Sequence, residues 1–320
     1  MRKALSLCLK AAVSGLLLYF ALATVNVSTV AARLSRIEFT WIALGLLLLL
    51  AQNVILSARW RQIVTRCGAD LPPRQAFRFT LIGTFFSQTL PSSVGGDAIR
   101  LWLLAKQTNW RVAAYSVFLD RVVGVVTLAA LVVACLPWTL VLIRDPVGRA
   151  ALMLIGLGFI AAGIVFVGLS WQRLKFLEHW APTRHLVAIA GVAVMILRSP
   201  RTFAVVFGLS VVIHLITALT GWCAAHAVGA DMPLSYSLFL IPPVMLVTVI
   251  PISIAGWGLR EGAMVAAFSY AGLPQADGLI ISLLFGAAYL IIGIIGGVIW
   301  ILSTDRPDRK IVPLAVIGDR

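Results

Sequence analysis

The chain has 320 residues, of which 61% are hydrophobic and only 12% are charged. A soluble domain carries about 25% charged residues, so this composition excludes a soluble globular protein and predicts an all-α integral membrane protein. The net charge of +14 would suit a nucleic-acid-binding protein, but no basic segment is interleaved with aromatic residues, so we expect no nucleic-acid partner. Lys and Arg gathered in cytoplasmic loops explain the charge better.

The N-terminus carries Arg2 and Lys3, followed by an apolar run from Ala11 to Thr24. This pattern, with Ala21-Leu22-Ala23 in the place of a cleavage site, is typical of a secretory signal peptide. The alternative is a first membrane-spanning helix whose basic residues stay in the cytoplasm. We favour the spanning helix because the topology of the remaining chain requires it.

Apolar stretches long enough to cross a bilayer occur six times, at about 9–25, 39–57, 112–143, 150–170, 203–228 and 277–302. Two further apolar stretches, 79–105 and 237–272, are interrupted by Pro, Gly and charged residues. An arm such as Thr80–Leu90 would rise only about 17 Å as a helix, against a hydrocarbon core of about 30 Å. We therefore predict two re-entrant hairpins beside six spanning helices, and an interfacial helix at 186–197.

The basic residues support one orientation of these elements. With the N-terminus inside, 19 of the 26 basic residues fall in segments assigned to the cytoplasm, namely 1–10, 58–78, 106–111, 171–202 and 303–320. Only four fall outside, namely Arg33, Arg36, Arg144 and Arg149. This distribution predicts that the N- and C-termini are both cytoplasmic.

The two interrupted stretches resemble each other. The first reads LPSSVGGDAIR from Leu90 to Arg100, and the second reads IPISIAGWGLR from Ile250 to Arg260. At an offset of 160 residues they share four identities: Pro91 with Pro251, Ser93 with Ser253, Gly96 with Gly256, and Arg100 with Arg260.

The order span, span, hairpin, span also occurs twice, and the second copy starts from the opposite side of the membrane. We therefore predict a four-plus-four inverted-topology repeat, about 9–143 and 150–302, within one transmembrane domain, followed by a short cytoplasmic tail at 303–320. In transporters with such repeats, matching Gly- and Pro-interrupted segments indicate the binding site.

Six charged residues lie within the hydrophobic segments and away from their ends, three acidic and three basic: Asp97, Arg100, Asp120, Arg121, Arg260 and Glu261. Each costs at least about 2.5 kcal/mol at the bilayer centre, so these residues must pair or serve function. Adjacent residues do not face each other on a helix, so we expect Asp120 to pair elsewhere, for instance with Arg100. Alternatively, Asp97 could be only a helix N-cap, and Arg121 could extend to the cytoplasmic interface.

Together with small residues at the two interruptions, these charges form the predicted substrate site. It comprises Ser92, Ser93, Gly95, Gly96, Asp97, Arg100, Asp120, Arg121, Ser253, Gly256, Arg260 and Glu261. The serines could instead only cap freed backbone amides. The scattered cysteines and histidines lack metal-ligand spacing, and no nucleophile–base pair or nucleotide loop is present. We therefore expect no metal, no cofactor and no enzymatic activity.

At three places the chain resembles the lysylphosphatidylglycerol synthase transmembrane-region family, also called flippase-like membrane proteins. The stretches that carry the resemblance are LPSSVGGDAIRLW at Leu90–Trp102, LDRVVG at Leu119–Gly124 and PISIAGWGLREG at Pro251–Gly262. Among its relatives, the multiple-peptide-resistance proteins combine a membrane module of this kind, which moves aminoacylated phosphatidylglycerol between leaflets, with a soluble domain that makes the lipid. Only 18 residues follow Leu302 here, so we expect that synthase domain to be absent.

The resemblance implies a translocase of the bacterial inner membrane that moves an anionic or zwitterionic phospholipid, or a lipid-linked head group, between leaflets. Arg100 and Arg260 would hold a phosphate, and Asp97, Asp120 and Glu261 would balance them, bind a cationic head group or carry a proton. A proton-coupled transporter of a small soluble anion is the main alternative, and a lateral opening between spans would favour the lipid. A lipid-modifying membrane enzyme and a non-transporting assembly partner are further alternatives, and the protein could form a homo-oligomer.

Overall fold

The structure is a computed structural model of the chain, and it describes residues 12, 14–16, 18–23, 33, 35, 37–90, 94–143, 145–168, 191–250 and 252–303. Within these ranges the chain forms α-helices joined by turns, without a strand. Five of the helices are long and apolar enough to cross a bilayer: α3 (Phe39–Arg66), α6 (Trp110–Ala134), α8 (Pro146–Gly168), α10 (Pro200–Ala227) and α13 (Gln275–Ser303). The prediction of an all-α protein with several apolar helices is confirmed.

These five helices correspond to five of the six predicted spans. The first predicted span, 9–25, lies partly outside the described residues, but residues in the range Ser14–Ala23 are helical. The predicted span 112–143 is divided, because α6 ends at Ala134 and a short helix α7 (Leu136–Leu142) follows. Pro137, at the start of α7, lacks the amide hydrogen that a continuous helix would require there.

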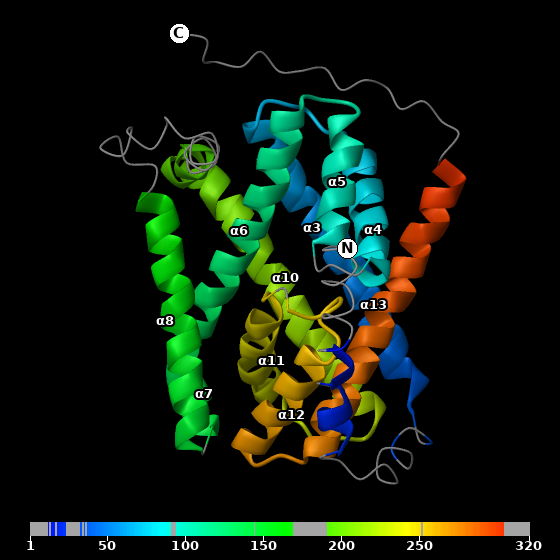
Figure 1. Cartoon of the computed structure of the whole chain (residues 1–320), viewed down its shortest axis with the longest axis vertical. Coiled ribbons are helices and arrows are strands. Elements are labelled where there is room, and N and C mark those ends of the chain that lie inside the picture. The colour runs from blue at the N-terminus through cyan, green and yellow to red at the C-terminus, as the bar shows by residue number, and fades with distance from the viewer. Residues whose placement is uncertain are drawn as a thin grey trace.

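Two pairs of shorter helices lie between the long ones. One pair is α4 (Pro73–Thr89) with α5 (Gly95–Ala105), and the other is α11 (Leu234–Thr248) with α12 (Leu259–Ala271). The helices are interrupted where the sequence predicts, but α4 begins at Pro73, six residues before the predicted stretch 79–105. Figure 1 shows the α4–α5 pair in the upper half of the molecule and the α11–α12 pair in the lower half, with their interrupted ends near mid-height.

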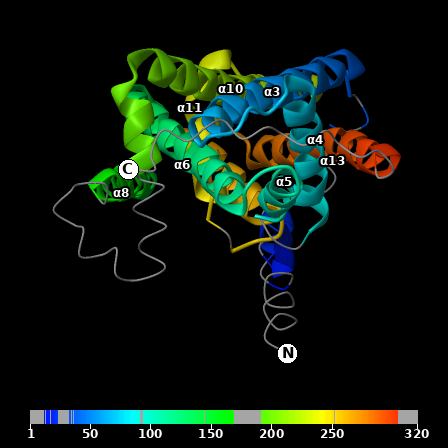
Figure 2. The same ribbon diagram turned by 90° about the horizontal axis from the view of Figure 1, so that it is seen from above.

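Close backbone contacts at glycines hold the α4–α5 pair and its neighbours together. A Cβ atom at Gly96 of α5 would lie only 2.2 Å from the carbonyl oxygen of Gly83 in α4. In the same way, a Cβ at Gly296 of α13 would lie 2.0 Å from the carbonyl oxygen of Leu81. Such small residues let helix backbones approach closely in membranes. In the view from above, α4 lies beside α13 and α3 beside α10, whereas α8 lies at the periphery (Figure 2).

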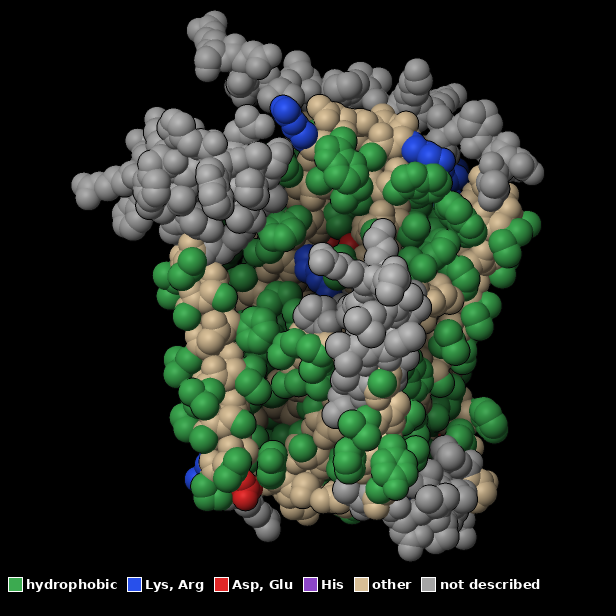
Figure 3. Space-filling view, viewed as in Figure 1, with side chains coloured by type: hydrophobic (Ala, Val, Ile, Leu, Met, Phe, Trp, Pro, Cys, Tyr) green, Lys and Arg blue, Asp and Glu red, His purple; other side chains and the backbone are tan. Residues whose placement is uncertain are grey.

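The distribution of side chains on the surface is that expected of a protein embedded in a bilayer. Figure 3 shows mainly hydrophobic side chains along the lengths of the helices, and charged side chains at the two ends. Basic side-chain atoms are also visible in a hollow at mid-height on this face. A charge at that depth is unfavourable unless it is paired or used, so the charged residues of the interior identify the candidate site.

Candidate substrate site

A buried group of charged side chains connects four helices. Asp120 of α6 accepts hydrogen bonds from Arg59 Nε of α3 at 2.9 Å and from Arg100 Nη2 of α5 at 3.0 Å. Arg59 also donates to the hydroxyl of Ser210 in α10 at 3.0 Å. All four residues are buried, and the Arg100 guanidinium lies 4.1 Å from the ring centre of Trp60. The predicted pairing of Asp120 with Arg100 is therefore present, with Arg59 as a second partner.

Asp97 extends this group toward a more accessible position. Its carboxylate contacts Arg121 Nη1 of α6 at 2.5 Å and Arg100 Nη1 at 3.5 Å. Asp97 is not the N-cap of α5, which is Val94, but lies in the first helical turn. The Arg121 side chain is 37% exposed, whereas Arg59 and Arg100 are buried. Arg121 is therefore the most exposed arginine of this group. Its guanidinium stays paired with Asp97 and does not extend alone to the cytoplasmic interface.

A second charged group lies at the start of α12. The Glu261 carboxylate accepts hydrogen bonds from Arg260 Nη2 at 2.7 Å and from the Ser282 hydroxyl of α13 at 2.8 Å through one oxygen. Its other oxygen accepts from the backbone amide of Gly258 at 2.6 Å. Arg260 donates to Glu261 and Ser282 through Nε and Nη2, so one edge of its guanidinium is fixed. The Glu261 side chain is 0% exposed.

A central cavity of about 200 Å³ brings the two groups together. Arg121 and Arg260 both line it, although they lie in different halves of the sequence. The remaining lining comes from the end of α4, from α11, from the second interruption and from α13, namely Ser87, Gln88, Met245, Thr248, Ala255, Gly256, Phe285 and Tyr289. The end of α4 and the second interruption therefore border the same partly open cavity.

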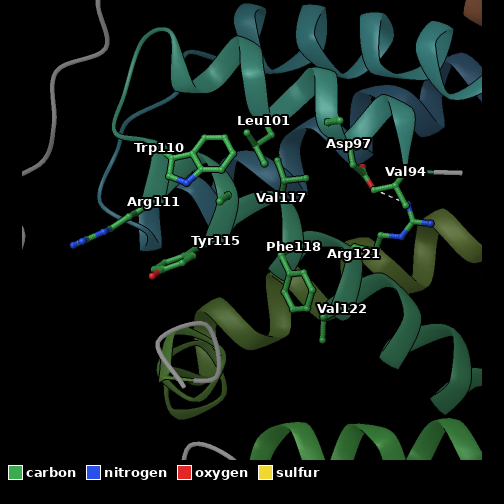
Figure 4. A pocket seen from close by; sticks show the side chains of 12 residues that line it. Val94, Asp97, Leu101, Trp110, Arg111, Tyr115, Val117, Phe118, Arg121 and Val122 are labelled. Carbon is green, nitrogen blue, oxygen red and sulfur yellow. Dashed lines mark hydrogen bonds and ion pairs between the residues drawn. The ribbon is translucent and has the colours of Figure 1, made fainter. Parts of the chain in front are cut away.

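An open groove of about 600 Å³ lies between α5 and α6 (Figure 4). Its walls are mostly apolar, with Leu101, Val117, Phe118 and Val122 among them. Figure 4 shows the ion pair of Asp97 and Arg121 at one side of the groove, and Trp110, Arg111 and Tyr115 at the other. Arg111 and Arg121 are ten residues apart on α6, which corresponds to about 15 Å along the helix. Arg121 thus lines both the groove and the central cavity.

The structure distributes the predicted site residues over three environments. Arg121, Gly256 and Arg260 line the central cavity, and Asp97 lines the groove. Asp120, Ser253, Glu261 and Arg100 are buried behind these surfaces, and Gly95 and Gly96 are buried against Leu90 and α4. Ser92 and Ser93, like Pro91 and Pro251, lie outside the described residues.

Arg100 and Arg260 therefore do not face one cavity together, despite their equivalent positions in the repeated sequence. Helix α5 begins at Gly95, five residues before Arg100, whereas α12 begins at Leu259, one residue before Arg260. The two arginines consequently lie about one turn apart in their helices. Arg121, rather than Arg100, is the cavity-lining partner of Arg260.

Other contributors were not predicted from the sequence. The sequence predicts that Arg59 lies in a cytoplasmic segment at 58–78, but α3 continues to Arg66 and Arg59 is buried. A signal was present: Gln52 and Arg59 are seven residues apart and therefore lie on one helix face, where both are buried. The neutral residues of the cavity, Ser87, Gln88 and Tyr289, had no comparable signal.

The family comparison covers nearly all of these elements. The family model described as the lysylphosphatidylglycerol synthase TM region matches residues 7–297. Comparison with curated proteins gives no match. The matched range includes both charged groups, the groove and the central cavity, and it confirms the resemblance of the three sequence stretches. The chain is a multi-pass membrane protein that belongs to the lysylphosphatidylglycerol synthase transmembrane-region family.

Proposed function

We propose that the protein is a translocase that moves a phosphate-containing lipid, or a lipid-linked head group, between leaflets of the bacterial inner membrane. One observation carries the proposal: Arg121 lines both the open apolar groove and the central cavity. A lipid in the groove would keep its acyl chains against Leu101, Phe118 and Val122 while its phosphate reached Arg121. A soluble anion would have no need of such a groove.

The ion pair of Asp97 and Arg121 suggests how the head group would enter. An anionic phosphate at membrane depth requires a compensating cation, because an unpaired charge in a low-dielectric environment is strongly unfavourable. The phosphate would replace the Asp97 carboxylate as the partner of Arg121, and Asp97 would keep its contact with Arg100 at 3.5 Å. Arg260 lines the same cavity and would be the next cation along the path.

The helix order supports an alternating-access mechanism. Helices α3 and α10 begin 161 residues apart, α4 and α11 begin 161 apart, and α6 and α13 begin 165 apart. The two interrupted pairs, read as re-entrant hairpins from opposite sides, would each contribute one end to the central cavity. In transporters built from inverted repeats, rocking of one repeat against the other exposes such a site to each side in turn. We propose this arrangement, with six spans and both termini in the cytoplasm.

Purified protein in vesicles should accelerate the exchange between leaflets of a phospholipid that carries a fluorescent acyl chain. Dithionite bleaches only the outer leaflet, so the bleached fraction should rise above that of protein-free vesicles and approach the whole. The same vesicles should not accumulate radiolabelled inorganic phosphate across a proton gradient. Phosphate uptake without lipid exchange would contradict the lipid proposal and favour a proton-coupled transporter of soluble anions.

A further inference from the structure

We infer that the head group which enters the central cavity has a net negative charge and carries hydroxyl groups, as a glycerol or sugar phosphate does. The inference rests on the proposed lipid translocation and specifies the class of lipid. The site would prefer anionic lipids to zwitterionic lipids and to lipids with a cationic aminoacyl group. Three observations support it: the charge of the Asp97–Asp120 group, the composition of the cavity wall, and the polar atoms beside the arginines.

The charged group around Asp97 and Asp120 contains more cations than anions. Within the part of the chain that the structure describes, Arg59, Arg100 and Arg121 form ion pairs with two carboxylates, Asp97 and Asp120, so these five side chains have a formal charge of +1. The six charged residues that the sequence places within the membrane, three acidic and three basic, are neutral together because they do not include Arg59. The pair of Arg260 and Glu261 is neutral and leaves this excess unchanged. A positive excess at membrane depth stabilises an anionic ligand and destabilises a cationic one.

The cavity wall presents the arginines but not their carboxylates. None of the described residues that line the cavity is acidic. Glu261 is fully buried behind Arg260, and both of its oxygens already accept hydrogen bonds. Asp97 lines the groove instead. An ammonium group in the cavity would therefore lie nearer to the two guanidinium groups than to their carboxylate partners, and like charges repel each other at short distance.

The Arg260 guanidinium has one edge fixed and one edge open. Nε and Nη2 donate to Glu261 and Ser282, and no hydrogen bond from Nη1 is made to the part of the chain that the structure describes. A Cβ on Gly286 would lie 2.3 Å from Nη2, so this glycine provides the space in which the side chain lies. Guanidinium N–H groups match phosphate oxygens well, so the open edge suits a phosphate.

Neutral hydrogen-bonding groups surround the two arginines. The Ser87 hydroxyl, the Gln88 amide and the Tyr289 phenol all belong to residues that line the cavity, whereas the Thr248 hydroxyl donates to the carbonyl oxygen of Met245 at 2.7 Å. Gln88 Oε1 is buried and accepts no hydrogen bond from any residue that the structure describes, which is unfavourable unless a ligand or a rearrangement satisfies it. Hydroxyl groups of a head group can both donate to and accept from such side chains. A trimethylammonium group can do neither.

Native mass spectrometry of the detergent-solubilised protein measures how strongly each lipid binds. It therefore compares the affinities of different head groups independently of transport. We expect phosphatidylglycerol to bind most strongly, phosphatidic acid less strongly, and phosphatidylcholine and lysyl-phosphatidylglycerol weakest, with about tenfold between the first and the last. Equal or stronger binding of lysyl-phosphatidylglycerol would overturn the inference. Binding in the expected order without any leaflet exchange would instead contradict the translocase proposal and leave the site intact.

Ala255 offers a matched pair of variants. It lines the cavity and has a positive φ of 51°, a conformation that Asp and Asn adopt more readily than other residues. Ala255→Asp and Ala255→Asn therefore differ in charge but hardly in shape. We expect Ala255→Asp to lower the preference for phosphatidylglycerol over phosphatidylcholine about tenfold, and Ala255→Asn to retain it. An unchanged preference in correctly folded Ala255→Asp, or the same loss in both variants, would overturn the inference.

Thr248→Asp and Thr248→Asn repeat this comparison on another wall of the cavity, in case the Ala255 variants do not fold. Size-exclusion chromatography of each purified variant reports folding. The Asp variant at Thr248 should again lose the preference for the anionic lipid, and the Asn variant should keep it. If both Thr248 variants fold and both keep the preference, the inference that the cavity selects an anionic head group is contradicted.

Discussion

Replacing Asp120 by Asn should destabilise the protein by about 3–5 kcal/mol, the typical effect of removing one partner from a buried ion pair. The substitution preserves the shape of the side chain but leaves Arg59 and Arg100 buried without their shared carboxylate. The remaining group would hold three arginines and only Asp97. We expect little purified protein and a markedly lower melting temperature in detergent.

Asp70→Asn is the matched control for this prediction. Asp70 also pairs with an arginine, Arg61, but the distance is 3.5 Å and the Asp70 side chain is 60% exposed. Exposed ion pairs contribute about 0–1 kcal/mol, so this variant should melt close to the wild type. If the two variants melt at the same temperature, the Asp120 group does not hold α3, α5 and α6 together as described.

Replacing Arg260 by Ala should abolish leaflet exchange and also lower stability. The loss of stability has a specific cause: Glu261 is fully buried, and without Arg260 its described partners would be the Ser282 hydroxyl and one backbone amide. Removing both side chains in Arg260→Ala with Glu261→Ala should therefore recover much of the melting temperature. Leaflet exchange should not recover, because the cavity would still lack its second guanidinium.

Arg260→Lys provides the complementary comparison. An ammonium group keeps the charge but cannot bind Glu261 along one edge while presenting another edge to a phosphate. We expect this variant to fold and to exchange lipid much more slowly than the wild type in the dithionite assay. Near-wild-type exchange by the Arg260→Ala, Glu261→Ala double variant would show that the pair is structural and that Arg260 does not hold the substrate.

The sequence predicts the helices of this protein well because apolar length and helix-breaking residues are local properties. Long apolar runs identify α3, α8, α10 and α13, and the Pro- and Gly-containing stretches identify both interruptions. The ends of the helices are harder to predict from sequence, because a helix can continue through polar residues that the fold buries. Arg59 in the last turns of α3 is the clearest example, and it changed the charge balance of the interior.

The positions of the candidate site residues relative to the cavity could not all be predicted, because they depend on helix geometry rather than on composition. Alignment of the repeated segments indicated that Arg100 and Arg260 are equivalent, but sequence does not determine where each helix begins. The start of α5 at Gly95 places Arg100 one turn beyond the cavity, against Trp60 and Asp120. Arg121 takes its place through α6, a helix that the repeat alignment at the interruptions did not include.

Leaflet exchange by Arg121→Ala is the most direct test of the account, because Arg121 alone connects the described groove and cavity. The control is Arg61→Ala, which removes an arginine from an exposed ion pair. We predict that vesicles containing Arg121→Ala exchange fluorescent phosphatidylglycerol no faster than protein-free vesicles, while vesicles with the same amount of Arg61→Ala match the wild type. Wild-type exchange by Arg121→Ala would contradict the account, since the head group would then reach the other leaflet without passing Arg121.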